Sequence, residues 1–442
     1  MITHIRVQNF KSWEDSEEVK LAPLTGFFGT NSSGKSSLLQ MLLLLKQTTE
    51  YKDAEDVIFF GDETSYINLG NFREVIHAHR MIAPLVFELQ CQLTHPRSPF
   101  KTSEDGSPWE QKVDKFAYEC VIRIENGKLV VEKLSYGVSL NGVAEIVCSE
   151  GHASFRNTYG EGSILKLENC YGIRSTGETE VEKFLRKYSS AFEELFAYVF
   201  YLGPTRAHPQ RQYHWEGSHP SDIGHWGDKM IDALLSARVD LKKIQSDEET
   251  VSIEEKISEW LREMELAYSF LLERTETRDG KDYDVRIQTK EYGAKIALAD
   301  MGYGLSQFLP VLVLCYYAPK GSTLILEQPG IHLHPMVQSQ LADLLIEVVN
   351  ERKLQILVES HSEHLLTRLQ RRIAEKQIPE ENVALYFCRN NDGASAIEKL
   401  EVDEESGDIK NWPENFFGDV MGDMFAMTDK QVETIAETEP EG

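Results

Sequence analysis

The stretch Gly29-Thr-Asn-Ser-Ser-Gly-Lys-Ser36 decides how this chain folds, because it has the G-x-x-x-x-G-K-S/T spacing of a phosphate-binding loop. It follows an apolar run at residues 23–28, which predicts a strand, and it opens a leucine-rich segment, which predicts a helix. In this setting successive backbone N–H groups can wrap a polyphosphate, and the helix N-terminus adds positive potential. We expect Lys35 to reach the β- and γ-phosphates and Ser36 to reach a Mg²⁺ ion. The loop therefore predicts that the chain binds a nucleoside triphosphate.

Two apolar runs far along the sequence could complete this site. Residues 322–326 lead into Glu327, and residues 354–358 lead into Glu359-Ser-His-Ser362. Nucleotide hydrolases need a rigid strand that presents a carboxylate to the Mg²⁺ of the triphosphate. Such a strand is common on its own, and a lone histidine such as His361 is more often structural. The order and spacing of the two runs favour a functional role for both.

A glycine-rich stretch, Asp300-Met-Gly-Tyr-Gly-Leu-Ser-Gln-Phe308, precedes the acidic run and opens an apolar helix. Ser306, near the helix start, could be an ordinary N-cap, as most such serines are. Alternatively, Ser306 and the dipole of its helix could cap the γ-phosphate held by another subunit. The order of phosphate-binding loop, Ser-Gln stretch, acidic strand and histidine favours the second interpretation.

Composition limits the class of protein. A chain of 442 residues with 41% hydrophobic residues can form two or three domains. The formal net charge of −26 argues against a surface that binds polyanions as a whole, although it leaves room for a local basic groove. Six scattered cysteines with no C-x-x-C pair argue against structural zinc and disulfides. No signal peptide or membrane-spanning run is evident, so we expect a cytoplasmic protein with no membrane partner.

Other motifs complete the pattern. They are Ile5-Arg-Val-Gln-Asn-Phe-Lys-Ser12, Tyr201-Leu-Gly-Pro-Thr-Arg206, Gly302-Tyr-Gly-Leu-Ser-Gln307, Glu327-Gln-Pro-Gly-Ile-His-Leu-His-Pro335, Glu359-Ser-His-Ser-Glu-His364 and Gly407-Asp-Ile-Lys-Asn-Trp-Pro-Glu-Asn-Phe-Phe417. In this order the chain resembles the ABC-type ATPase heads of the SMC, RecF and OLD-like proteins. It is most similar to bacterial AAA-type ATPases with a G-[FY]-G-[ILV]-S-Q signature and an E-Q-P-E-x-H-L-H-P acidic strand. The resemblance covers both ends of the chain closely and the middle only through its Gly-Pro-Thr-Arg element.

The resemblance implies an α/β fold, a P-loop ABC-type ATPase head assembled from both chain ends with inserted β-rich and helical lobes. We expect residues 1–84 to form the N-terminal part of the head, 85–177 a β-rich lobe, 178–282 a helical insertion and 283–442 the C-terminal part of the head. Helical periodicity appears near 178–200 and 252–273, and Asn126-Gly127 between apolar runs predicts a hairpin.

The resemblance also implies a head-to-head dimer, or a higher oligomer, with ATP and Mg²⁺ between the P-loop of one subunit and the signature of the other. The expected ATP contacts are Lys11, Asn31, Ser32, Ser33, Gly34, Lys35, Ser36 and Ser37. The expected trans signature is Gly304, Ser306 and Gln307, the Mg²⁺ ligands are Ser36 and Glu327, and the catalytic residues are Glu327, Gln328 and His361. Lys11 could instead be a surface lysine, and Arg206 could be a structural arginine or a phosphate sensor. His332 and His334 fall in the dimer-interface loop of the family, and a metal between them is the less favoured interpretation.

The residues after Glu327 depart from the pattern. An ABC hydrolase typically follows its Mg²⁺ acid with a glutamate that polarises the attacking water. Gln328 stands there, and it can orient water but cannot accept a proton. Gly330 replaces a further glutamate of the close family. We therefore predict slow hydrolysis, with ATP acting as a dimerising switch.

Several functions are compatible with these features. The first is a nucleotide-gated switch or scaffold for a separately encoded effector protein, because ATPases resembling this one often occur in bacterial antiphage operons. The second is a RecF- or SMC-like DNA-maintenance ATPase that binds DNA across its dimer, which the acidic charge and the lack of a long heptad pattern disfavour. An OLD-like nuclease would need a further domain after Cys388, and a transporter ATPase would have its P-loop and signature much closer together.

Overall fold

A central six-stranded sheet positions the phosphate-binding loop. The computed structural model describes residues 1–51, 56–92, 115–138, 142–149, 152–157, 160–167, 169–174, 180–246, 249–275, 281–413, 416–417, 426–428 and 430. Within them the strand order of this sheet is β12-β19-β20-β4-β21-β22. The strands are β12 (Val199–Leu202), β19 (Thr323–Glu327), β20 (Gln355–Glu359), β4 (Leu24–Gly29), β21 (Val383–Asn391) and β22 (Ala394–Lys399). All pair in parallel except β21 with β22, which form an antiparallel hairpin.

The position of β4 confirms that the fold is α/β and is built from both ends of the chain. This N-terminal strand lies between β20 and β21, which come from the C-terminal third. Strand β4 aligns Leu24 with Ile356 on one side and with Val383 on the other. The six-stranded sheet is therefore complete only when both parts of the chain are present.

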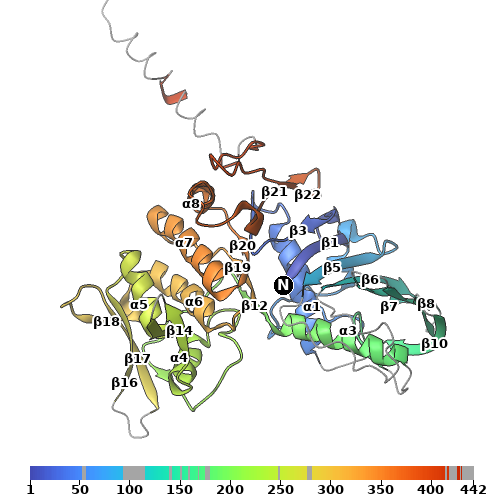
Figure 1. Ribbon diagram of the computed structural model, residues 1–442, viewed down its shortest axis with the longest axis horizontal. Helices are drawn as coiled ribbons and strands as arrows, with labels where there is room; N and C mark the ends of the chain where they lie inside the picture. Colours follow the sequence, from blue (N-terminus) through green and yellow to red (C-terminus); the bar gives the residue numbers. More distant parts are fainter. Residues whose placement is uncertain are drawn as a thin grey trace, which may run out of the picture.

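Helices cover both faces of the central sheet, which explains why its strands are continuous apolar runs rather than alternating ones. One face packs against α1 (Lys35–Glu50) and α3 (Glu180–Ala197), and the other against α6 (Tyr303–Tyr317), α7 (Pro335–Arg352) and α8 (Glu363–Ala374). Successive residues point to opposite cores, so that Phe27 packs on the α1 side and Phe28 on the α7 side. Figure 1 shows these layers, with the two lobes on either side of β12, β19 and β20.

An antiparallel sheet of ten strands packs beside α1 and α3. Its path is β11-β10-β9-β8-β7-β6-β5-β1-β2, and β3 also pairs with β1. The bounds are β1 (Ile2–Phe10), β2 (Trp13–Asp15), β3 (Val19–Lys20), β5 (Leu85–Gln92), β6 (Lys115–Glu125), β7 (Lys128–Val138), β8 (Gly142–Ser149), β9 (His152–Asn157), β10 (Gly160–Leu167) and β11 (Ile173–Arg174). The predicted hairpin at Asn126-Gly127 is confirmed, since Glu125 pairs with Lys128 and both turn residues have positive φ.

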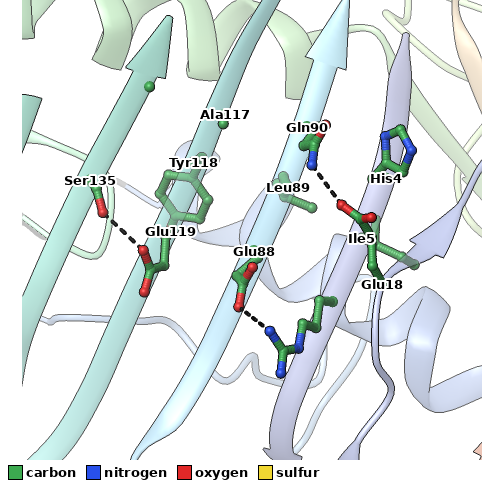
Figure 2. Close-up of a pocket in the computed structure, with 12 residues that line it drawn as sticks. His4, Ile5, Glu18, Glu88, Leu89, Gln90, Ala117, Tyr118, Glu119 and Ser135 are labelled. Carbon is green, nitrogen blue, oxygen red and sulfur yellow. Dashed lines mark hydrogen bonds and ion pairs between the residues drawn. The ribbon is translucent and has the colours of Figure 1, made fainter. Parts of the chain in front are cut away.

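The open face of this sheet carries a shallow pocket of about 210 Å³. Figure 2 shows that its polar side chains form hydrogen bonds and ion pairs with one another across neighbouring strands. Arg6 pairs with Asp15 at 2.7 Å and with Glu88 at 3.3 Å, and Gln90 donates a hydrogen bond to Glu18. Antiparallel sheets usually have one apolar face on the core and one polar face toward solvent. Here the polar side chains of the open face bond one another.

The second lobe contains α4 (Met230–Val239), α5 (Ile253–Glu263) and a small sheet. Its strands are β13 (Tyr213–His214), β16 (Ser269–Arg274), β17 (Asp282–Gln288) and β18 (Lys295–Ala297), and β14 (Lys243–Ser246) pairs separately with β15 (Glu249–Ser252). The helix predicted over 252–273 is wrong in its second half. Helix α5 stops at Glu263, Glu265 has φ of 55°, and the residues of β16 alternate in burial and pair with β17.

The range 178–282 therefore contains more than helices, because β12 from this range pairs with β19 in the central sheet. Short helical turns complete the chain: α2 (Phe72–Val75), η1 (His77–His79), η2 (Leu298–Asp300) and η3 (Glu380–Asn382). In the described part of the chain, no helix is both long and apolar enough to cross a membrane.

Candidate nucleotide-binding site

The phosphate-binding loop joins the end of β4 to the start of α1, as its sequence predicts. Gly34 immediately precedes α1 with φ of 91°, and Gly29 has φ of 135°, conformations that favour glycine. A Cβ atom on Gly34 would lie 2.3 Å from the hydroxyl of Ser395. Ser395 in turn bonds Ser12 at 2.7 Å. The loop is thus fixed by β22 and by the turn after β1.

Lys35 folds back onto the loop that carries it. Its ammonium group donates to the carbonyl oxygens of Thr30 at 2.7 Å and Gly29 at 3.2 Å, and to the Ser33 hydroxyl at 3.3 Å. Burial lowers the pKa of Lys35, and the nearby Glu359 carboxylate opposes this shift. A buried ammonium whose partners are mainly carbonyl oxygens can exchange them for phosphate oxygens, which are stronger acceptors.

A cavity of about 400 Å³ lies over the loop. Its lining includes every residue that the sequence predicts to contact ATP, together with three more from other elements. The lining is Lys11, Ser12, Asn31, Ser32, Ser33, Gly34, Lys35, Ser36, Ser37, Glu359 and His361. The structure therefore brings the loop, the turn after β1 and the end of β20 to one hollow. Glu327 is not among the residues that line it.

Two carboxylates lie side by side next to this hollow. Glu327 ends β19 and Glu359 ends β20, and the parallel register pairs them directly. Both are almost fully buried, with 6% and 5% of their surface exposed. Burial raises the pKa of Glu327 to about 7, and the adjacent Glu359 charge adds to the rise. Burial also raises the pKa of Glu359, against hydrogen bonds from Ser36 and Gln328 and the charge of Lys35.

Gln328 and His361 approach Glu359 and the loop from two sides. Gln328 has φ of 49°, its backbone N–H donates to the Glu359 carbonyl at 2.9 Å, and its side chain lowers the pKa of the Glu359 carboxylate. His361 is largely exposed at the rim of the cavity, and the partial loss of water around its ring together with the charge of Lys35 lowers its pKa. A neutral imidazole there can donate to or accept from a phosphate oxygen.

Lys11 is half-buried rather than a free surface lysine. It has φ of 54°, its backbone N–H donates to the Val75 carbonyl at 2.6 Å, and its ammonium group bonds Gln40 of α1. Burial lowers the pKa of Lys11, and the charge of Glu327 opposes this shift. Lys11 therefore supplies positive charge between the cavity and Glu327.

Arg206 and Tyr201 contact Glu327 on the side away from the cavity. The sequence left Arg206 open between a structural arginine and a phosphate sensor, and it assigned no role to Tyr201. The Tyr201 hydroxyl donates to the Glu327 carboxylate, and Nη2 of Arg206 donates to the Glu327 carbonyl at 3.1 Å. Arg206 is 2% exposed, and its Nε and Nη1 atoms have no hydrogen-bond partner. Glu359 was also missed as a site residue, although its place at the end of the second apolar run was visible.

The predicted signature lies at the start of α6, on the other face of the sheet from α1. Gly302, not Ser306, is the N-cap of this helix. Ser306 is 3% exposed and its hydroxyl donates to the Tyr303 carbonyl at 2.8 Å, and Gln307 is 4% exposed. A Cβ atom on Gly304 would lie 2.7 Å from the His332 carbonyl, so the glycine allows this loop to pack closely. The outward part of the signature is Tyr303, which is 45% exposed.

The donors near the loop suit a Mg²⁺ ion. Mg²⁺ prefers oxygen ligands and usually takes one or two carboxylates together with substrate phosphates. Ser36 supplies a hydroxyl, and Glu327 and Glu359 supply carboxylates. Oε2 of Glu359 is buried and has no hydrogen-bond partner, so a ligand position is available.

Comparison with known proteins agrees with this site. The profile of the AAA ATPase domain family matches residues 1–129 and 219–366, more than half of the chain and both parts of the central sheet. A second profile, described as a protein of unknown function (DUF3696), matches residues 378–427, which include β21 and β22. No curated protein matches the sequence.

Solved structures of SMC heads are similar over most of the chain, each at 12% sequence identity. An SMC head bound to the C-winged helix domain of ScpA covers 91% of this chain and 98% of its own, with a TM-score of 0.47. The match to the SMC head domain from Thermotoga maritima covers 91% of this chain and 99% of that domain, with a TM-score of 0.38. A third match is an Smc head domain with an extended coiled coil, bound to the C-terminal domain of ScpA derived from Pyrococcus furiosus. It covers 97% of this chain and 99% of that chain, with a TM-score of 0.38.

Proposed function

The chain belongs to the AAA ATPase domain family, and from this premise we propose that it is a slow ATPase whose bound ATP joins two copies and thereby controls a separate effector protein. The observation that carries the proposal is Gln328. It lies where an attacking water would be polarised, it bonds Glu359, and it cannot accept a proton. Such a site is suited to holding ATP for a long time rather than to turning it over rapidly.

The residues of the loop would bind the triphosphate. The backbone N–H groups of residues 31–36 and the ammonium of Lys35 would hold its β- and γ-phosphates, and Lys35 would leave the carbonyls of Gly29 and Thr30 to do so. Ser36 with the neighbouring carboxylates would hold Mg²⁺, which when bound neutralises charge that develops on the phosphates. Gln328 would orient the water, and His361 would contact the γ-phosphate from the rim.

Two copies would meet with the signature of one facing the P-loop of the other. The exposed ring of Tyr303 and the neighbouring exposed residues Ile331 and Met336 support this surface, because they form an apolar rim beside the signature. In a single chain Ser306 is buried and bonded to Tyr303, so it would have to turn outward to reach a phosphate of the partner. The start of α6 supplies favourable dipole potential in either case.

Antiphage defence is the setting that the sequence resemblance supports, with the effector encoded nearby. DNA maintenance is the less supported alternative. An SMC-like arm needs long heptad helices, whereas the longest helices among the described residues, α3 and α7, have 18 residues each. The net charge of −26 also disfavours a DNA-binding surface.

The experiment measures oligomeric state, ATP affinity and turnover of the purified protein. We expect ATP with Mg²⁺ to convert monomers to dimers, and Tyr303→Arg, at the exposed position beside the signature, to prevent this without weakening ATP binding. We expect turnover below about 1 s⁻¹. A rate of several per second that Glu327→Ala abolishes would contradict the slow switch. A pull-down with elution by nucleotide would identify the effector, and recovery of DNA instead would favour the alternative.

A further inference from the structure

Glu359, rather than Glu327, is the acid nearest the phosphate-binding loop. Strand β20 lies between β19 and β4, so Glu359 is one strand closer to the loop than Glu327 is. Glu359 pairs in register with Phe27 of β4, two residues before the loop begins at Gly29. Neighbouring strands are about 4.8 Å apart, and only Glu359 lines the cavity over the loop that carries Ser36.

The partners of the two carboxylates are different. The Ser36 hydroxyl and the charge of Lys35 both act on the Glu359 carboxylate and lower its pKa against the effect of burial. In P-loop NTPases the serine or threonine of the loop and an acid from a separate strand hold the metal together. Glu327 instead accepts from Tyr201 and faces Arg206 and Lys11. Glu327, the residue that the sequence motif assigns to the metal, thus contacts side chains outside the cavity over the loop.

Glu359 also has the free ligand atom. Its Oε2 is buried and has no hydrogen-bond partner in the structure. A buried carboxylate oxygen is costly unless it is hydrogen-bonded, paired or bound to a metal. Glu359 lines the cavity over the loop, and Glu327 does not.

We infer that Glu359 is the carboxylate that holds the Mg²⁺ of bound ATP together with Ser36, and that Glu327 supports it from the adjacent strand. The inference rests on the proposed nucleotide binding. It connects the metal to water positioning, because the backbone N–H of Gln328 donates to the Glu359 carbonyl and its side chain lowers the pKa of the Glu359 carboxylate. An ion held by Glu359 would therefore fix the residue that orients the water.

The test compares Glu359→Gln with Glu327→Gln, the same isosteric change on adjacent, equally buried strand ends. Binding of Mn²⁺ to the protein–ATP complex is measured by electron paramagnetic resonance, which does not depend on turnover. We expect Glu359→Gln to weaken Mn²⁺ binding by at least about tenfold, the scale of a lost metal-site partner. Glu327→Gln should change it by less than about threefold. Equal losses, or a larger loss in Glu327→Gln, would overturn the inference.

A double-mutant cycle with Ser36→Ala provides a second, independent measurement. If Ser36 and Glu359 hold the same ion, the losses in Mn²⁺ affinity from Ser36→Ala and Glu359→Gln are not additive, whereas those from Ser36→Ala and Glu327→Gln are. Additive losses for the first pair would overturn the inference. ATP affinity in EDTA separates the two proposals. The wild-type chain should bind ATP there through Lys35, and a wild-type chain that binds no ATP at all would contradict the proposed function itself.

Discussion

The hydroxyl of Tyr201 donates a hydrogen bond of 3.1 Å to Oε1 of Glu327. The two residues lie on neighbouring parallel strands, β12 and β19, although they are 126 positions apart in the sequence. Arg206, in the loop after β12, holds the carbonyl of the same glutamate. The edge strand β12 and the loop after it therefore fix the position of Glu327. Residues from the middle of the sequence thus support the candidate site.

Removing this hydroxyl should destabilise the acidic strand. We expect Tyr201→Phe to lower the free energy of unfolding by about 1 kcal/mol, the usual net value of a buried hydrogen bond. Tyr198→Phe is the matched control, because Tyr198 is 44% exposed on the turn before β12 and should change stability by less than about 0.5 kcal/mol. Urea denaturation measures both. Equal effects of the two variants would show that the hydrogen bond to Glu327 contributes nothing specific.

Replacing Lys35 should remove most of the affinity for ATP. A charged contact to phosphate contributes about 2–3 kcal/mol, so Lys35→Ala should weaken ATP binding by about 30- to 150-fold. Lys20→Ala, which changes an exposed lysine on β3, is the control and should leave affinity unchanged. Isothermal titration calorimetry measures both. If Lys35→Ala binds ATP as well as the wild type does, the nucleotide does not occupy this loop.

Supplying a proton acceptor at position 328 should accelerate hydrolysis. General base catalysis contributes on the order of 10²–10⁴ in rate, and part of this requires geometry that glutamine already provides. We therefore expect Gln328→Glu to raise turnover by at least about tenfold, and Gln328→Ala to lower it. Phosphate release under saturating ATP and Mg²⁺ measures turnover. No gain in Gln328→Glu, with ATP affinity retained, would mean that water activation is not the missing step.

The raised pKa of Glu327 predicts how stability depends on pH in the metal-free protein. A carboxyl whose folded pKa is about 7 binds its proton more tightly in the folded chain than in the unfolded one, so it favours folding at low pH. This contribution should be lost as pH rises from about 4.5 to about 7, and it amounts to about 3 kcal/mol. Urea denaturation in EDTA at pH 5.5 and pH 8 measures it. Glu327→Gln should weaken the dependence, and an unchanged slope would contradict the assignment.

Sequence analysis predicted the local parts of the site better than their arrangement. The loop, α1 and the two acidic strands follow from motif spacing and apolar runs, which act over a few residues. The proximity of Glu359 to Ser36 depends on β20 lying next to β4, and strand order is set by packing over the whole fold. For the same reason the burial of Ser306 and the strand at residues 269–274 could not be read from periodicity. The alternatives left open for Lys11 and Arg206 also depended on which elements pack around them.

The place of β4 between β20 and β21 has a consequence for how the chain matures during synthesis. The side chain of Gln355 bonds the backbone of Ile2 in both directions, and the hydroxyl of Tyr386 bonds the carbonyl of Lys20 across 366 positions. At about 5–20 residues per second, the first strands emerge roughly 20–70 s before these neighbours exist. The phosphate-binding loop thus leaves the ribosome well before the two strands that flank β4 are available to it. A nascent chain interrupted before Val383 would carry the whole nucleotide motif and lack one of the two strands that flank it.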